Sequence, residues 1–281
     1  MKIAWHNVDA AEDADFIVVG CGSEEGSRFE GAAKGPEAIR KASLDWLSGE
    51  WVDGTHFRYV PQGKFSGKGV FDFGDVQKEH LSDVVEDIAL RKRVPIVLGG
   101  DHSLTFESVK GLSRVHKNMS IVFIDAHPDF TSRGESYYGS VMSDLRELET
   151  VNLKKSVLLG IRGATEHEQE NISASKINVV PSIAFAEHGV KKIFSEIKKA
   201  VGKKVFVSVD LDVLDPAFAP GVSDPVPGGI SSNELVSLCK LLATLKPVGF
   251  DVMELVPDND VRDRTASLAA KLVSEIIGSY K

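Results

Sequence analysis

The sequence predicts a single three-layer α/β/α domain that spans residues 1–281 and has a central, mostly parallel sheet. Three observations support this prediction. Short apolar, β-branched runs alternate with helical patterns from one end of the chain to the other, which is typical of α/β folds with right-handed crossovers. The runs are continuously apolar, as expected of strands buried on both faces. No linker-like stretch interrupts the 281 residues, so one large domain is favoured over two small ones.

The apolar runs predict the strands of this sheet. In chain order they are Phe16–Val19, Val94–Leu98, Ser120–Ile124, Ser156–Ile161, Ile177–Val180, Val205–Val209 and Val248–Val252.

Segments with helical patterns lie between these runs, and several have recognisable start signals. The predicted helices are Pro36–Leu47, Lys78–Leu90, Leu104–Val115, Val190–Ala200, Ser232–Ala243 and Thr265–Tyr280. Ser231 and Glu234 have the spacing of a capping box, and Pro36 suits a first helical turn. The longest irregular piece, Asp215–Gly229, is rich in Pro and Gly and follows a group of carboxylates. Long ordered loops of this kind are often functional.

Composition and charge exclude several classes of protein. Hydrophobic residues at 42% leave ample material for a core, and Cys21 and Cys239 are too few for a disulfide framework or a thiolate cluster, so we expect two buried thiols. A net charge of −8 argues against a nucleic-acid surface and is compatible with a small cationic substrate. Because the first residues lack a leader pattern and no run has the roughly 18 apolar residues of a membrane span, we expect a cytoplasmic protein without a membrane partner.

Three segments each end an apolar run with residue types that bind metals. They are VLGGDHS (97–103), IDAHPDF (124–130) and SVDLDVLDP (208–216). Loops that leave the carboxyl ends of parallel strands meet in the crevice where ligands bind. The three segments are therefore predicted to build one site.

The ligand types in these segments indicate a pair of divalent ions. In Asp125-x-His127-x-Asp129 and Asp210-x-Asp212, the spacing of two residues puts side chains on the same side of an extended backbone. Carboxylates and imidazoles without thiolates favour Mn²⁺, with Fe²⁺, Co²⁺, Ni²⁺ and Zn²⁺ as alternatives. Together with His102 the set has more ligands than one ion needs, and two carboxylate-bridged ions would use all six.

Each segment also has an ordinary structural interpretation when it is taken alone. GGDHS suits a tight turn and a helix N-cap, DAHPD suits a solvated loop, and Asp210 and Asp212 suit strand-end carboxylates paired with Arg or Lys. The three together, each after a buried strand pattern, favour a metal site, because unpaired carboxylates at such depths are costly.

The three segments resemble, in order, the metal-binding signatures of the ureohydrolase (arginase/agmatinase) family, with agmatinase the closest likeness. Further similar stretches cover nearly the whole chain: GPEAIRKAS (35–43), FDFGDV (71–76), GIR (160–162), PAFAPG (216–221), PGGIS (227–231) and DVMEL (251–255). The resemblance implies an arginase-like fold and a hydrolase that acts on linear amidines.

The resemblance also implies a role for each candidate residue. One manganese ion would be held by His102, Asp125, Asp129 and Asp210, and the other by Asp125, His127, Asp210 and Asp212. Glu254 would bind the guanidinium group of the substrate, since a carboxylate pairs well with that planar cation. Its alternative is an ordinary salt-bridged strand-end glutamate. Asp129 would also act in catalysis, taking a proton from the nucleophile and passing it to the departing amine.

The sequence departs from the family pattern near the predicted site. Tyr138, in YYGSVM (137–142), stands where agmatinase-like relatives carry a histidine that shuttles protons. A phenol with an ordinary pKa near 10 shuttles protons poorly at neutral pH, so Tyr138 predicts a lower rate, an alkaline optimum or another substrate. Asp224 is open to two interpretations, a contact for a distal ammonium or a solvated loop residue. Gly163-Ala164-Thr165 replaces the acidic residues of arginase-type members, which disfavours arginine.

We therefore expect an amidinohydrolase that converts agmatine to putrescine and urea in polyamine biosynthesis. The alternatives are another ureohydrolase activity, such as guanidinobutyrase, arginase or formimidoylglutamase, and a metal-binding homologue without turnover. The resemblance also implies a homo-oligomer, a trimer or a hexamer.

Overall fold

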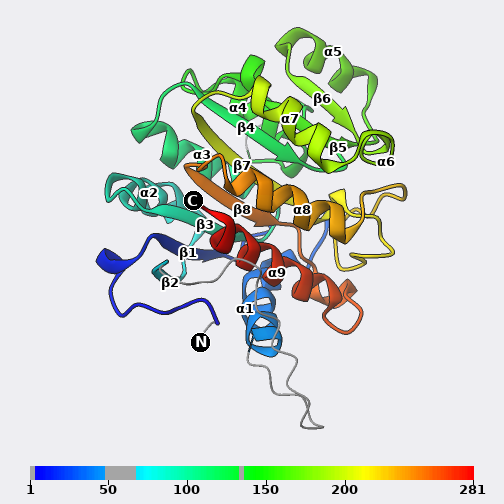
Figure 1. Ribbon diagram of the computed structural model, residues 1–281. Helices are drawn as coiled ribbons and strands as arrows, with labels where there is room; N and C mark the ends of the chain where they lie inside the picture. Colours follow the sequence, from blue (N-terminus) through cyan, green and yellow to red (C-terminus); the bar gives the residue numbers. More distant parts are fainter. Residues whose placement is uncertain (1–3, 48–67, 133–135) are drawn as a thin grey trace.

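Eight parallel strands form the sheet at the centre of the computed structural model, which describes residues 4–47, 68–132 and 136–281 (Figure 1). From one edge to the other the strands are β2 (Val70–Asp75), β1 (Phe16–Cys21), β3 (Val94–Gly99), β8 (Gly249–Met253), β7 (Lys204–Asp210), β4 (Met119–Ile124), β5 (Val157–Ile161) and β6 (Asn178–Pro181). Every strand pairing is parallel, so the predicted mostly parallel sheet is entirely parallel.

Helices cover both faces of the sheet and complete three layers (Figure 1). On one face lie α1 (Gly35–Leu47), α6 (Ile183–His188), α7 (Val190–Ala200), α8 (Ser232–Ala243) and α9 (Arg264–Ser279). The other face carries α2 (Lys78–Leu90), α3 (Leu104–Val115), α4 (Val141–Arg146) and α5 (Glu166–Ser175). The predicted single α/β/α domain is thereby confirmed.

Alternate residues of the central strands pack into different layers, which explains their continuously apolar sequences. In β3, Ile96 and Leu98 belong to the core with α1 and α9, whereas Val97 points into the core with α2 and α3. Burial on both faces leaves no position for a polar residue to reach solvent. The strand prediction succeeds for this reason.

The elements that sequence reasoning missed share a weak apolar pattern. Strand β2 lies at the sheet edge and is only partly buried. Helix α5 has a polar sequence, and a capping box between Thr165 and Glu168 fixes its start. Because this helix has no apolar stripe, its sequence lacks the periodic pattern by which amphipathic helices are recognised. Helices α4 and α6 have only six residues each, too few for a helical period.

Local signals that were recognised are borne out. The Ser231 hydroxyl accepts a hydrogen bond from Glu234 N, and the Glu234 carboxylate accepts one from Ser231 N, which completes the predicted capping box. Cys21 and Cys239 are both buried free thiols, and burial raises the pKa of each to about 12. None of the described helices has the length and apolar character needed to cross a bilayer.

Candidate metal centre and active site

The carboxyl ends of four adjacent strands bring the predicted site residues together. His102 follows β3, and Asp125, His127 and Asp129 follow β4. Asp210 ends β7, Asp212 lies in the short 3-10 turn Leu211–Val213 directly after it, and Glu254 follows β8. Because β3, β8, β7 and β4 are neighbours in a parallel sheet, their carboxyl ends share one edge, and segments more than 150 residues apart in sequence meet there.

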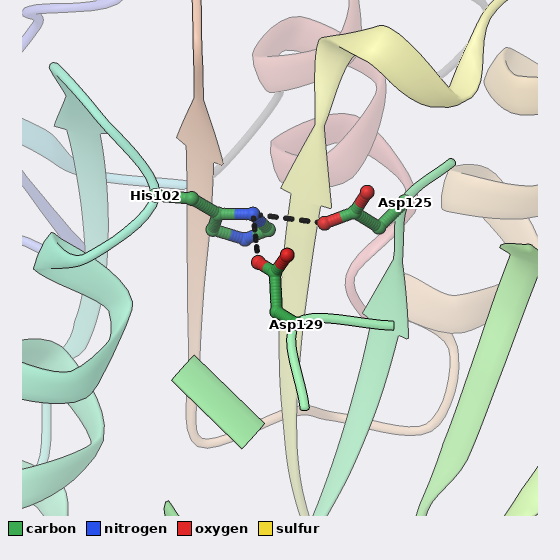
Figure 2. Close-up of side chains that lie close together, drawn as sticks. All are labelled: His102, Asp125 and Asp129. Atoms are coloured by element: carbon green, nitrogen blue, oxygen red, sulfur yellow. Dashed lines mark ion pairs between the residues drawn. The ribbon is translucent and has the colours of Figure 1, made fainter. Parts of the chain in front are cut away.

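The His102 ring is the centre of a first group of ligands. Its Nδ1 atom lies 3.0 Å from Asp125 Oδ2, 3.0 Å from Asp210 Oδ2 and 3.4 Å from Asp129 Oδ2. Figure 2 shows the two carboxylates of Asp125 and Asp129 converging on this nitrogen from the loop after β4. The imidazole stacks flat against Phe123 with ring centroids 4.5 Å apart, which holds the ring plane.

A second group forms around His127 and shares Asp125 with the first. His127 Nδ1 lies 2.9 Å from Asp212 Oδ2 and 3.5 Å from Asp125 Oδ1. The carboxylates also cap nearby backbone: Ala126 N donates to Asp212 Oδ1, and Asp212 N donates to Asp210 Oδ1. The His127 side chain is 29% exposed, whereas the carboxylates of both groups are at most 6% exposed. His127 therefore lies on the solvent side of the cluster.

Four carboxylates in one buried pocket disturb the titration of every member. Burial, followed by the charge of Asp125, raises the pKa of Asp129 well above its usual range. Burial and neighbouring carboxylates likewise raise the pKa of Asp210 and Asp212. Burial opposes a charged imidazole, yet Asp125 and Asp212 raise the pKa of His127 to about 12. These shifts indicate that the pocket is strongly short of positive charge.

The residues present fit a pair of divalent cations. Two sets of three ligand atoms, His102–Asp125–Asp129 and Asp125–His127–Asp212, each lie within 4.8 Å of one another. The buried Nδ1 of His102 has no hydrogen-bond partner among the described residues, although carboxylate oxygens surround it. An imidazole nitrogen and several carboxylates around a small volume are the ligands that Mn²⁺ and related ions prefer.

Two of the predicted residues hold a backbone conformation that side chains rarely adopt. Asp129 has φ of 50° and Glu254 has φ of 66°, both in the left-handed region. Such strain costs free energy and persists where surrounding structure enforces it, often at functional sites. Here Met142 N donates to Asp129 O, and Glu254 N donates to Gly100 O. These bonds hold the two turns that aim the carboxylates.

Glu254 lies buried beside the first group. Its Oε1 accepts a hydrogen bond of 2.8 Å from His102 N, and its Oε2 accepts one of 2.5 Å from Ser223 Oγ. Burial is the main reason that the pKa of this carboxyl rises to about 7. No lysine, arginine or histidine side chain forms an ion pair with Glu254 in the described part of the chain. The alternative of an ordinary salt-bridged glutamate is therefore disfavoured.

Tyr138 lies outside the two ligand groups. Its hydroxyl accepts a hydrogen bond of 3.1 Å from Arg28 Nε, and its ring contacts Tyr137 and Phe29 edge-on. Burial is the first cause that raises its pKa to about 12, so it stays protonated at neutral pH. Asp224 is partly exposed, with one carboxylate oxygen 3.9 Å from His127 Nε2. It thus lies at the solvent side of the cluster.

A buried polar network behind His102 was missed by sequence reasoning. His102 Nε2 lies 2.9 Å from Ser208 Oγ, which is 3.2 Å from Thr105 Oγ1, and Thr105 donates to Asp251 Oδ2. Ser208 and Asp251 are register partners on β7 and β8. If Nε2 donates to Ser208, Nδ1 keeps its lone pair for a cation, the arrangement usual for metal-binding histidines. The available signal was a buried Ser and Asp inside otherwise apolar strands.

Arg162 is a second residue whose role the sequence did not reveal. Its guanidinium donates to the backbone carbonyls of Asp212, Val213, Leu214 and Val226, and thus ties the loop after Asp212 to β5. Only the GIR similarity pointed to this position. In the irregular stretch 215–229, Gly228 N donates a hydrogen bond to Asp215 Oδ2, and Asp215 N donates one to Ile230 O, so the two ends of the loop are held together.

The fold and the cluster define an all-parallel α/β protein with a candidate metal centre of carboxylates and imidazoles at the carboxyl edge of its sheet. Comparison with known proteins identifies the family to which this fold and cluster belong. The model of the Arginase family matches residues 14–278. Proclavaminate amidinohydrolase of Streptomyces clavuligerus is 31% identical over 95% of this chain and 88% of its own length. An agmatinase of Edwardsiella ictaluri is 30% identical, over 94% and 88%.

Solved structures agree with the sequence comparison. A hypothetical agmatinase from Burkholderia thailandensis has a TM-score of 0.85 at 26% identity, covering 97% of this chain and 87% of that chain. Arginase from Bacillus subtilis has a TM-score of 0.82 at 27% identity, covering 94% and 98%. The chain belongs to the arginase family, whose members carry a binuclear metal site, and it is an amidinohydrolase acting on C–N bonds. The resemblance inferred from the sequence is thereby confirmed.

Proposed function

We propose that this protein is a two-metal amidinohydrolase that converts agmatine to putrescine and urea. The observation that carries the proposal is that two ligand groups share Asp125 and lie beside the buried carboxylate of Glu254. A metal pair with an adjacent carboxylate suits a substrate that presents a planar cation. Cytoplasmic polyamine biosynthesis is the proposed setting.

The six predicted ligands would hold two Mn²⁺ ions, and Asp125 and Asp210 would contribute to both ligand sets. Ions bound there would lower the pKa of a water molecule and so supply a nucleophile at neutral pH. The proximity of Asp210 to His102, with 3.0 Å between Oδ2 and Nδ1, supports a place for Asp210 in the first group. Its place in the second group is a proposal from the family pattern.

The chain's own residues then orient the substrate and move the proton. Glu254 would pair with the guanidinium and hold its carbon toward the cluster, while Ser223 and His102 N keep the carboxylate in place. Asp129 would take the proton of the attacking water and deliver it to the leaving nitrogen as the C–N bond breaks. One water molecule is consumed, and urea and an amine are released.

Agmatine is the preferred substrate among the guanidino compounds. Several relatives at 30–31% identity are agmatinases, and one at 31% is proclavaminate amidinohydrolase. The chain lacks acidic side chains at Gly163–Thr165, which argues against arginine. Asp224, at the solvent side of the cluster, offers a carboxylate for the distal ammonium of agmatine.

The test is product release from manganese-loaded protein across a substrate panel. Urea release is measured for agmatine, arginine, guanidinobutyrate, guanidinopropionate, proclavaminate and guanidine. Formamide release is measured for formiminoglutamate. We expect the highest kcat/KM with agmatine. A higher value with another compound would replace the substrate and keep the amidinohydrolase class, whereas no turnover of any compound by protein with two bound ions would overturn the proposal.

Tyr138 supports a second candidate, a metal-binding homologue without turnover. Its phenol is held by Arg28 and stays protonated at neutral pH, so it lacks the proton exchange of a histidine. Under the agmatinase proposal, Tyr138→His changes an activity that the wild type already has. Activity that appears only in Tyr138→His would favour the second candidate.

We also propose a homo-oligomer, a trimer or a hexamer, on the support of family membership alone. Sedimentation equilibrium of the full chain tests this assembly. A single species at the mass of one 30.5 kDa chain would overturn it.

A further inference from the structure

A cavity of about 450 Å³ lies at the amino ends of the strands, opposite the carboxyl ends that carry the candidate metal centre. It is lined by the turns that lead into β3 and β8, by the start of β7, by the end of α3 and by Tyr280 after α9. These are the amino ends of three strands whose carboxyl ends carry the candidate active site. The cavity is therefore separate from the proposed function and does not depend on it.

The lining of this cavity is basic. Lys92, Arg93, Lys204 and Lys246 contribute four positive charges, His116 adds an imidazole, and the lining has no acidic side chain. The whole chain has a net charge of −8, so this edge reverses the average charge of the molecule. Four like charges around one cavity repel one another, and an anion bound among them would remove that repulsion.

The cationic groups of the lining lack carboxylate partners. Arg40, Arg91 and Arg114 each form ion pairs with Asp or Glu, whereas none of the four lining cations forms one with a described residue. Arg93 donates through Nη2 to the carbonyl oxygen of Glu12. Its Nε is buried without a hydrogen-bond partner among the residues that the structure describes. The site thus has positive charge to offer a ligand.

Two of the lining lysines also have an unusual backbone conformation, which is an observation independent of the charges. Lys92 has φ of 60° and Lys246 has φ of 55° in the two turns that enter β3 and β8. Glycine is the usual residue for this left-handed conformation after a helix. A lysine at both positions places a long cationic side chain at the cavity at some cost in backbone strain.

We propose that this cavity binds a small molecule bearing a phosphate chain. Lysine ammonium and arginine guanidinium groups are the side chains that bind phosphate oxygens, and several of them suit an anion of several charges. The volume lies within the roughly 300–1,000 Å³ of small-molecule sites, which exceeds the need of a single inorganic ion. Val94, Val115, Pro247 and Val248 provide an apolar wall for the organic part of such a ligand.

The experiment is calorimetric titration of the full chain with inorganic tripolyphosphate and, separately, with ATP. We expect saturable binding of one ligand per chain. Lys204→Ala combined with Lys246→Ala should weaken it at least tenfold. The matched control is Lys198→Ala combined with Lys199→Ala, two exposed lysines of α7 with the same change in charge, which should alter affinity less than twofold.

Comparison of ATP with tripolyphosphate distinguishes a ligand with an organic group from a phosphate chain alone. Tighter binding of ATP would show that the apolar wall holds an organic group, and equal binding would assign the site to the phosphate chain alone. Phosphates also bind metal ions in solution. This contribution to the measured heat is the same for all variants, so it cancels when the two double variants are compared. Absence of saturable binding, or an equal loss in both double variants, would overturn the proposal.

A second readout comes from the ring of His116. Burial and the neighbouring Lys204 hold its pKa below the ordinary 6.5, and Lys92, Arg93, Lys246 and Tyr280 also line the cavity. A bound anion favours the charged imidazolium, so tripolyphosphate should raise the His116 pKa measured by NMR. An unchanged His116 titration at saturating ligand would place the anion elsewhere.

Discussion

The carboxyl ends and the amino ends of the same three strands, called the acidic edge and the basic edge below, carry opposite charge. At the carboxyl ends of β3, β7 and β8 lie a buried imidazole and carboxylates, whereas lysines and an arginine surround the amino ends. The acidic edge is almost closed to solvent, and the lysines of the basic edge are exposed. Buried charges need partners, while exposed charges are largely solvated. Substitutions at the acidic edge should therefore have far larger effects than equivalent ones at the basic edge.

The largest effect is expected from Asp125→Asn. Asp125 is the residue common to both ligand groups, 3.0 Å from His102 Nδ1 and 3.5 Å from His127 Nδ1. Its loss should reduce bound manganese and lower kcat/KM for the best panel substrate by at least about a thousandfold. Elemental analysis and urea release measure the two consequences. Asp83→Asn, the same change at an exposed site on α2, serves as control and should retain both properties.

Full metal content and activity in Asp125→Asn would contradict the assignment of this edge as the metal centre. An equal loss in Asp83→Asn would instead indicate a general effect of charge. Neither outcome is compatible with the comparison of the two edges.

Glu254→Gln should have the next largest effect. The amide keeps the size of the side chain but loses the charge that pairs with a guanidinium, a difference of about 1.5–3 kcal/mol, or about 10–150-fold in kcat/KM. Manganese content should stay at the wild-type value. Ser223→Ala removes only the hydrogen bond to Oε2 and should cost less. A Glu254→Gln protein with wild-type kcat/KM would exclude this residue from substrate binding.

Asp251→Asn is expected to weaken metal binding without removing a ligand. Asp251 is fully buried and is linked to His102 through the hydroxyls of Thr105 and Ser208. Loss of such supporting partners typically costs about 10–100-fold in metal affinity, which a manganese titration followed by EPR of the free ion would detect. Glu275→Gln changes another buried carboxylate, which lies on α9 and pairs with Lys240 of α8 and Lys271 of α9. It should lower stability and leave metal affinity unchanged, so equal affinities in both variants would remove the positioning role.

Sequence reasoning recovered the acidic edge better than the basic one. The ligands of Asp125–Asp129 and Asp210–Asp212 stand together just after apolar runs, so periodicity and residue type alone place them at one edge. The basic edge is formed by single lysines from separate turns, each ordinary by itself. Their convergence depends on strand order, which a sequence does not state.

The same distinction explains the smaller errors. Ser208 and Asp251 were missed because their meaning lies in a register pairing between two strands. Strand β2 and helix α5 were missed because they bury little apolar surface. The contact between Tyr138 and Arg28 joins loops 110 residues apart, which local patterns cannot reveal.

The smallest expected effect is at the basic edge, from Lys92→Gly. Lys92 follows helix α2 with φ of 60°, the position where many helices end in glycine. Glycine removes the strain of a left-handed Cβ, about 1–2 kcal/mol, and the greater entropy of the unfolded chain offsets about 0.4–1 kcal/mol of that gain. We expect unfolding to become less favourable by up to about 1.6 kcal/mol, measured by denaturant titration. Lys92→Ala keeps the strain and removes the charge, so it separates the two contributions.

The combination of stability and affinity makes this substitution informative. If Lys92→Gly gains stability and loses tripolyphosphate affinity, the strained backbone is retained because the lysine side chain is needed at the cavity. Proteins commonly trade stability for function at sites of this kind. Gain of stability with unchanged affinity would exclude Lys92 from the anion site and leave Arg93, Lys204 and Lys246 as its cations. The acidic edge offers the reverse case: Glu254→Gly also relieves a left-handed backbone, with φ of 66°, but it removes the carboxylate proposed to hold the substrate.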